Sequence, residues 1–523
     1  MPPAIPAPGP APEDRTAPSP TPSPAPAASR SRHPGLVMPV LAFCGMVVAV
    51  MQTLVVPLLP HVPDLTGASP GAAGWLVTIT LLTGAVFTPV LGRVGDMYGK
   101  RRVLLASLGV LSVGSVLCAV SSDIGVLITG RALQGAALAV IPLGISIIRD
   151  ELPAERVLPA IALMSSTLGI GAAIGLPVAA VVMENFDWHT MFWASAALGL
   201  LDLLLVLWIV PESPVRSPGR FDLPGTLGLT ATLVGLLLAI TQGSDWGWTS
   251  PRTIGLLGAS VVVGLLWGWF ELRTVSPMVD LRVSARPAVL LTNVAALLIG
   301  FAFYANSLVT GQMVQEPTST GYGLGASIVV SGLCLLPGGL AMVALSPVSA
   351  RISAAYGPRT ALALAAVVMA VGYVVRFFTS HSLWLIVAGA TVVSSGTAIA
   401  YSALPALVMR AVPVGETAAA NGLNTLMRSV GQACCSAVVA AVLAHVTFVA
   451  GGRTAPTLHA YLLIFLIAGG TALAALVATL FLPSDRPSDR PSHRVRGGRG
   501  PLRGRAGGTV TVSASVTAAP ESA

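Results

Sequence analysis

The feature that most constrains the fold is a series of long apolar runs separated by short charged connections. A helix needs roughly 20 apolar residues to cross a bilayer, and fourteen runs approach this length. Hydrophobic residues make up 54% of the chain and charged residues 10%, which excludes an ordinary soluble protein. We therefore expect an all-α membrane protein. The predicted spans are Val37–Leu59, Ala72–Leu91, Val103–Ser121, Ile124–Ile148, Leu158–Met183, Thr190–Val210, Leu223–Thr241, Thr253–Phe270, Ala288–Leu308, Gly325–Leu345, Thr360–Phe378, Leu383–Leu407, Asn421–Val446 and Leu458–Leu482.

A charged motif that reads as a short Gly-rich turn occurs twice between these runs. The copies are Thr88–Arg102 and Ser346–Arg359, and their proline, tyrosine, glycine and two of their arginines align. Asp96 of the first copy becomes Ala354 in the second. Two copies in register favour an internal repeat over two unrelated basic turns. Transporters are often built from such repeats, with the substrate site between them.

Positive charge lies almost entirely on one side of the predicted spans. If the N-terminus is inside, the inner connections carry Lys100, the only lysine, and most of the arginines, whereas the outer ones hold little beyond Arg252 and Arg453. The positive-inside rule then places both termini in the cytoplasm. Removing one span would invert every later connection and destroy this asymmetry, so the pattern also supports an even number of spans.

Five regions follow from this organisation. Residues 1–36 form a Pro/Ala-rich cytoplasmic tail and residues 484–523 a basic one, and both compositions predict disorder. Residues 37–211 and 288–483 each contain six spans, and residues 212–287 form a linker with two inserted spans. The basic tail suits anionic lipid headgroups. It lacks the interleaved aromatic residues that nucleic-acid binding favours, so no nucleic-acid partner is expected.

Other functional classes have little support. The five cysteines lie in apolar runs without metal or disulfide spacing, so no metal or cofactor is expected. The seven histidines are scattered, and no Gly-rich lysine loop for ATP is present, which argues against an enzyme. A membrane sensor would need a folded soluble domain, and both tails have compositions typical of disorder.

Four motifs carry a resemblance to a known family. They are Gly92–Arg102, Arg131–Gly135, Gly169–Pro177 and Gln242–Trp248. From about Val37 to Pro483 the chain resembles the major facilitator superfamily, in its fourteen-helix drug:proton antiporter branch. The resemblance implies two six-helix bundles plus two extra central helices.

The resemblance also implies a function. The chain would be a monomeric secondary transporter of the plasma membrane that exports hydrophobic or cationic small molecules, such as antibiotics. Export would occur in exchange for protons, by alternating access. The alternative is export of an endogenous metabolite or lipid with another coupling ion or none.

The first motif implies a conformational latch. In the family this acid holds the two halves together by meeting a helix N-terminus and nearby arginines, and an anion is favourable at such a terminus. The alternative is that Asp96 only balances the local positive charge. The predicted latch residues are Gly92, Arg93, Asp96, Gly99 and Arg101.

Three residues are candidates for proton coupling. Arg131 lies inside the fourth predicted span, where a guanidinium needs a partner or a water-filled cavity, unless it reaches the outer interface. The resemblance gives it a coupling role, and Gln134 shares its helix face. Relatives often carry an aspartate in the first span, but the corresponding residue here is Met51. Asp202 is the only acid deep in a predicted helix, and Glu184 is a weaker candidate.

Small residues and amides complete the candidate site. Gly171, Gly175 and Pro177 resemble the antiporter motif of exporters, although a plain packing face would also explain the glycines. Residues Gln312–Gly325 form an outer loop that either gates the cavity or is an ordinary turn. Polar side chains expected to line the substrate cavity are Gln52, Thr53, Tyr304, Asn306, Asn424 and Arg428, together with Asn293 and Gln432.

Overall fold

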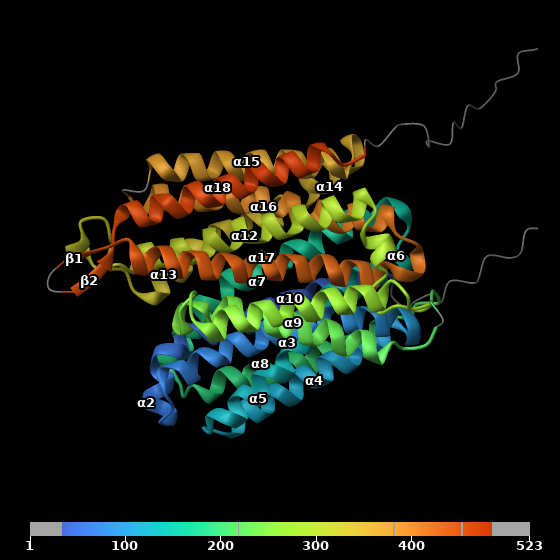
Figure 1. The fold of residues 1–523 in the computed structure, drawn as a ribbon, viewed down its shortest axis with the longest axis horizontal. Helices are drawn as coiled ribbons and strands as arrows, with labels where there is room; N and C mark the ends of the chain where they lie inside the picture. Colours follow the sequence, from blue (N-terminus) through green and yellow to red (C-terminus); the bar gives the residue numbers. More distant parts are fainter. Residues whose placement is uncertain (1–33, 218, 380–381, 451–452, 484–523) are drawn as a thin grey trace, which may run out of the picture. The chain divides into compact units, whose positions relative to one another are not determined.

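The computed structural model describes residues 34–217, 219–379, 382–450 and 453–483. The two predicted tails therefore lie outside the described residues, except for positions 34–36. The first half of the chain is helical from its first described residue (Figure 1). Its helices are α1 (Pro34–Thr53), η1 (Val56–His61), α2 (Val62–Thr66), α3 (Pro70–Tyr98), α4 (Lys100–Val120), α5 (Ile124–Gln134), η2 (Gly135–Ala139), α6 (Val140–Glu151), α7 (Ala154–Asn185) and α8 (His189–Ile209).

The rest of the chain adds an inserted helical hairpin and a second half. The hairpin consists of α9 (Leu223–Trp246) and α10 (Pro251–Glu271), followed by the short α11 (Leu281–Ser284). The elements of the second half are α12 (Pro287–Gln315), η3 (Thr318–Thr320), α13 (Ile328–Ala344), α14 (Ser346–Tyr356), α15 (Pro358–Phe378), α16 (Leu383–Ala411), η4 (Val414–Glu416), α17 (Thr417–His445), β1 (Thr447–Ala450), β2 (Arg453–Pro456) and α18 (Leu458–Leu480). The antiparallel β1–β2 pair, which the sequence did not predict, joins α17 to α18.

The number of spans agrees with the sequence-based expectation. Thirteen segments are long and apolar enough to cross a membrane, and the number rises to fourteen if α13 and α14, bent by 43° at their junction, form one span. The predicted all-α membrane fold is confirmed. The fourth predicted span is not a uniform helix, because the chain between α5 and α6 narrows to the 3₁₀ segment η2.

The expected Gly-rich turn is wrong in its local structure. Helix α3 continues through the motif to Tyr98, and only Gly99, with φ of +119°, breaks the chain before α4 begins. The second copy behaves alike: α14 runs to Tyr356 and Gly357, with φ of +86°, precedes α15. A left-handed φ favours glycine because it has no Cβ. One glycine in each motif therefore makes the turn, while Gly92 and Gly95 are helical.

Each half has its own apolar core, and the inserted hairpin lies beside the junction between them. One core consists almost wholly of residues from α1–α8, and another of residues from α12–α18. A third, smaller core joins Leu82 on α3, Leu233 on α9 and Leu426 on α17. Helix α9 thus contacts both halves at once, whereas α10 packs mainly on α9. Figure 1 shows α9 running beside α3 and α17, with α10 next to α9.

Candidate functional site

The halves meet mainly along α3 with α17 and α7 with α13, and α7 also contacts α14 and α16 while α6 contacts α17. We call the end of the helices that carries Arg93, Lys100 and Arg149 the basic end. Close approach on the α3–α17 side depends on small residues. A Cβ added at Gly92 would lie 2.7 Å from the carbonyl oxygen of Ala418, and one at Gly422 would lie 2.9 Å from that of Thr88. Larger side chains at either glycine would push the two helices apart.

Asp96 lies at this junction, at the start of α17. Its side chain is fully buried, and its carboxylate accepts hydrogen bonds from the backbone N–H groups of Ala419, at 2.9 Å, and Ala418, at 3.3 Å. The first N–H groups of a helix lack partners within the helix. Glu416, which precedes α17, makes no capping hydrogen bond with its side chain. An acid from the first half therefore caps a helix of the second half.

The cations around Asp96 differ from the expected arginines. Lys100 lies 3.7 Å from the Asp96 carboxylate and 2.5 Å from that of Asp150, all three side chains being buried. Arg149 makes a second contact between the halves, because its guanidinium donates to the hydroxyl of Thr417 on α17. The cation nearest to Asp96 is thus a lysine four residues later in the chain, beyond the break at Gly99, and an arginine binds the same helix start separately.

The other predicted latch residues contact the linker after α8. Arg101 donates from its side chain to the carbonyl oxygen of Leu207, at 2.5 Å, and from its backbone to Glu212, at 3.2 Å. A Cβ at Gly99 would lie 2.7 Å from the Glu212 carboxylate. Arg93 is half-buried, near Gly219. These residues secure the α3–α4 break against the linker rather than against α17.

Arg131 lies inside the first half, where it joins three helices. Its side chain is 2% exposed and donates to the carbonyl oxygens of Leu76 on α3, at 3.0 Å, and Met51 on α1, at 3.2 Å. It also donates to the amide oxygen of Gln134, at 2.6 Å, whose NH₂ group donates to Ser115 on α4. The guanidinium thus obtains the polar partners that a buried cation requires.

A small cavity adjoins this group. It has a volume of about 10 Å³ and is lined by Gln52, Thr80, Arg131 and Gln134 among others. That is about the space one water molecule needs. Thr53, at the end of α1, does not line the cavity; its hydroxyl donates to the carbonyl oxygen of Val50.

Asp202 occupies a different place in the same half. It lies on α8 with no exposed surface, and neither carboxylate oxygen has a hydrogen-bond partner among the described residues. Its neighbour is the thiol of Cys44 on α1. A buried carboxyl group whose neighbouring donor is a thiol, which donates only weakly, is unusual and indicates either strain or a functional role. Glu184, in contrast, is exposed at the far end of α7.

Helix α7 uses small residues on two faces. Gly171 and Gly175 face α1, and a Cβ at Gly171 would lie 2.6 Å from that of Ala49. The other face contacts α13 of the second half: a Cβ at Gly339 would lie 2.7 Å from that of Ala173, and one at Gly332 would lie 2.9 Å from Pro177. The two predicted motif glycines therefore pack within the first half, while Pro177 lies between the halves.

The polar residues of the second half form separate contacts. Asn424 donates to Asn293 at 3.1 Å, between α17 and α12. The guanidinium of Arg428 lies 4.5 Å from the ring centre of Tyr401, and it donates to Thr425 at 3.1 Å. Tyr304 is partly buried against the second core. This set brings α12, α16 and α17 together around Arg428.

Asn306 has a partner that the sequence analysis missed. Its side-chain oxygen accepts from Arg376 on α15, and its NH₂ group donates to the carbonyl oxygen of Ala390 on α16 at 3.2 Å. The Arg376 guanidinium also lies 4.4 Å from the ring centre of Phe465. The signal was present in the sequence, because Arg376 falls inside a predicted span and an arginine there needs a partner.

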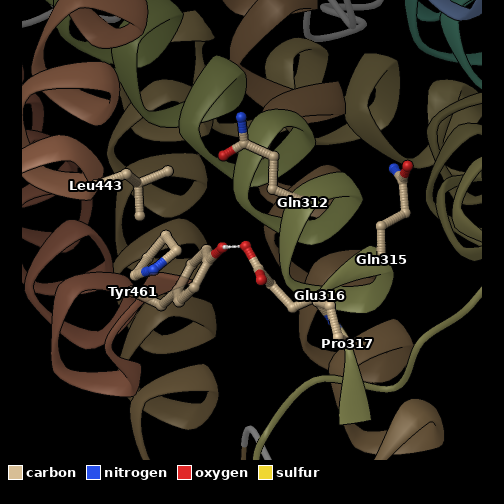
Figure 2. A pocket seen from close by; sticks show the side chains of 7 residues that line it. Gln312, Gln315, Glu316, Pro317, Leu443 and Tyr461 are labelled. Carbon is tan, nitrogen blue, oxygen red and sulfur yellow. Dashed lines mark hydrogen bonds between the residues drawn. The ribbon is translucent and has the colours of Figure 1, made fainter. Parts of the chain in front are cut away.

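A larger cavity lies at the end opposite the basic end. It has a volume of about 350 Å³ and is lined by Gln312, Gln315, Glu316, Leu443 and Tyr461 among others. Figure 2 shows the Glu316 carboxylate pointing toward the Tyr461 hydroxyl, which donates to it at 3.0 Å, whereas Gln315 points away. The cavity has the size of a small-molecule pocket.

The loop beside this cavity is held by hydrogen bonds. Tyr322 donates to the carbonyl oxygen of Pro456 at 2.6 Å, and the N–H of Gly325 donates to the carbonyl oxygen of Glu316 at 2.7 Å. Burial, with the charge of Glu316 nearby, raises the pKa of Tyr322 to about 12. The Tyr322 hydroxyl therefore remains a donor at neutral pH.

Comparison with known proteins places this arrangement in a family. The model of the Major Facilitator Superfamily matches residues 41–433 and, in a second match, residues 294–518. Multidrug resistance protein Stp of Mycobacterium tuberculosis is 28% identical over 404 residues, covering 76% of this chain and 74% of the relative. The probable multidrug resistance protein EmrY of Escherichia coli is 27% identical over 297 residues, 56% of this chain and 57% of that protein.

A solved structure has the same fold. The human organic anion transporter MFSD10 superposes with a TM-score of 0.62 at 17% identity, covering 85% of this chain and 98% of that one. At this identity the likeness concerns the fold alone. The family match, which spans both halves and the inserted hairpin, agrees with the two bundles and the span count described above. The chain belongs to the major facilitator superfamily and is a multi-pass membrane transporter.

Proposed function

We propose that this transporter exports small hydrophobic molecules in exchange for protons, by alternating access between its two six-helix bundles. The observation that carries the proposal is the capping of α17 by Asp96. It is a polar joint between the halves, confined to one end, and such a joint can break and re-form as the bundles rock. The names of the bacterial relatives favour drug-like substrates.

The basic end is assigned to the cytoplasm. Connections rich in arginine and lysine stay on the cytoplasmic side during insertion, and Arg93, Lys100 and Arg149 all lie at this end. The N-terminus, the C-terminus and the Asp96 joint then belong to the inner face of the plasma membrane. In the described conformation this joint is formed, and we infer that substrate loading from the cytoplasm requires Asp96 to leave α17.

Two groups of the first half are assigned to proton coupling. Arg131 holds α1, α3 and α5 together and borders a water-sized cavity, so a change in its hydrogen bonds is transmitted to three helices. Asp202 provides a carboxyl group that can take up and release a proton inside the bundle. The family's frequent first-span acid is Met51 here, which leaves Asp202 as the coupling acid that we propose.

The test uses inverted membrane vesicles with an acidic interior and a pH-sensitive dye. A panel of lipophilic compounds and antibiotics is added to vesicles that carry the wild-type chain, Arg131→Ala or, as a control, Arg252→Ala. We expect substrates to trigger proton release in the wild type and the control but not in Arg131→Ala. Substrate uptake without proton movement would contradict the exchange, and uptake of no compound would contradict drug export.

A further inference from the structure

The charges of the second half are strongly one-sided. Its α-helices, α12 to α18, contain no aspartate or glutamate, and its two acids, Glu316 and Glu416, lie in connections. The same helices carry two buried arginines, Arg376, which is 2% exposed, and Arg428, which is 6% exposed. Buried cations in a membrane protein are costly and usually mark a functional site. The acid that a cationic ligand would need is therefore missing from these described helices.

The two arginines differ in how completely the protein satisfies them. Arg376 contacts Asn306 and the ring of Phe465, between α12, α15 and α18. Arg428 has Thr425, one turn earlier on the same helix, and the ring of Tyr401 on α16. Among the described residues no carboxylate lies within 4.0 Å of its guanidinium. A guanidinium has five N–H donors, so Arg428 has most of its donor capacity left for a ligand.

The position of Arg428 suits a ligand that passes between the halves. It lies on α17, which contacts α3 of the first half, α9 of the hairpin, and α12 and α16 of its own half. Leu426 on the same helix belongs to the core shared with α3 and α9. Phe303 packs on Tyr401 with their ring centres 5.4 Å apart, which places aromatic surface beside the charge.

The facing helices of the first half offer no compensating acid at this level. Of the first-half helices that contact the second half, α3 carries Asp96, whose carboxylate caps α17 at the basic end. Helices α6 and α7 carry acids only in their terminal turns, namely Asp150, Glu151, Glu155 and Glu184. Glu316, which lines the cavity at the opposite end, accepts from Tyr461 there. Of the buried charged side chains on these described helices and on α12–α18, only Arg428 lies away from a terminal turn of its helix.

We propose that the transported molecules are organic anions, with a carboxylate, sulfonate or phosphate group on an apolar body, and that Arg428 binds the anionic group. This inference rests on the proposed transport function and names its substrate class. An anion supplies the charge and the acceptors that Arg428 lacks, and an arginine binds such groups through two parallel hydrogen bonds. A lipophilic cation would instead be repelled by a buried like charge. Export of an anion is also favoured by a negative cell interior.

The test compares two ligands with the same apolar body and opposite charge, pyrenebutyrate and pyrenebutylamine. Binding to the purified full-length chain in detergent is measured by calorimetry for the wild type, Arg428→Met, Arg428→Lys and the control Arg252→Met. We expect the wild type to bind the anion about tenfold more tightly than the amine. Arg428→Met should lose this preference, and Arg428→Lys should keep part of it because a lysine retains the charge without the planar fork.

The outcomes separate this inference from the proposed exchange. Equal binding, preference for the amine, no binding of the anion, or a preference that survives Arg428→Met each overturns it. Even if a variant fails to fold, the preference of the wild type for the anion or the amine still tests the proposed substrate class. In vesicles, proton-coupled uptake of the amine alone would keep the exchange and overturn the anion preference. Anion uptake without proton movement would support the anion preference and contradict the proton exchange.

Discussion

Asp96 provides α17 with the cap that the residues before this helix do not provide. Its two hydrogen bonds join residues 322 and 323 positions apart in the chain. A charged cap combines hydrogen bonding with the favourable field of the helix terminus. The strength of this capping contact therefore depends on the charge of one carboxylate, and a neutral residue of the same shape is the sharpest way to test it.

Asp96→Asn should weaken the capping contact between the halves without creating a cavity. Losing the charge at the helix start costs about 1–2 kcal/mol, which corresponds to roughly tenfold more opening. Hydrogen exchange at the N–H groups of Ala418 and Ala419 should accelerate accordingly, and the transport rate should change. Asp64→Asn, an exposed acid at the opposite end, is the matched control. Unchanged exchange in Asp96→Asn would show that the carboxylate does not hold α17.

Asp202→Asn tests the coupling assignment separately. The variant keeps the shape of the side chain and loses its ability to bind and release a proton. We expect substrate-driven proton release to be lost, while exchange of labelled for unlabelled substrate continues. Ser195→Ala, which removes a buried hydroxyl from the same helix, is the control. Proton release at the wild-type rate in Asp202→Asn would rule out this residue.

Single residues also show what the sequence could and could not predict. That Asp96 meets a helix start was expected from the family resemblance, and α17 is the helix that the structure supplies. The nearest cation, Lys100, was expected to be an arginine because charge counts do not give distances. The contact of Arg428 with Tyr401 joins residues far apart in sequence, and no local spacing encodes such a contact.

Among the elements, α7 of the first half packs against helices of both halves. One face packs on α1 through Gly171 and Gly175, and the other packs on α13, where Gly339 meets Ala173. Without a hydrophobic effect between helices in lipid, such association depends on close packing of small residues. A bulky residue on either face should therefore act as a wedge, and its effect depends on which contact it enters.

Gly339→Val should separate α13 from α7. The added Cβ would lie 2.7 Å from that of Ala173 and 3.0 Å from the carbonyl oxygen of Gly169, so backbone has to move. Overpacking of this kind costs about 1–3 kcal/mol. We expect a lower melting temperature in detergent and slower transport. Gly258→Val on α10 has no atom within 4 Å of the new Cβ and should be tolerated. Equal melting temperatures for the two variants would contradict this tight contact.

The α3–α4 motif shows how far element boundaries could be predicted. The glycine content suggested a turn over the whole motif, but Gly92 and Gly95 serve helix packing and only Gly99 adopts a left-handed conformation. Sequence alone does not separate these two uses of glycine, because both need the missing Cβ. The spans themselves were predictable, since their length and apolar content follow directly from the bilayer.

At the scale of the whole molecule, the arginine asymmetry predicts the orientation of the two halves in the membrane. Cysteines introduced at Ser319 and Glu155, both exposed, should report opposite sides of the membrane on a background without the native cysteines. We expect an impermeant thiol reagent added to intact cells to label Ser319→Cys, and to label Glu155→Cys only after the membrane is opened. The reversed pattern would invert the assignment of the basic end.

The contact of α9 with both halves has a consequence for the lipids around the transporter. On the α3–α17 side the inserted hairpin stands between the junction of the bundles and the acyl chains, whereas no helix of the hairpin covers the α7–α13 side. The two sides of a protein built from two similar halves therefore differ, because only one junction between the halves is covered by the hairpin. We therefore expect an amphiphile that reaches the transporter sideways from the bilayer to enter from the uncovered side, so that entry is one-sided despite the internal repeat.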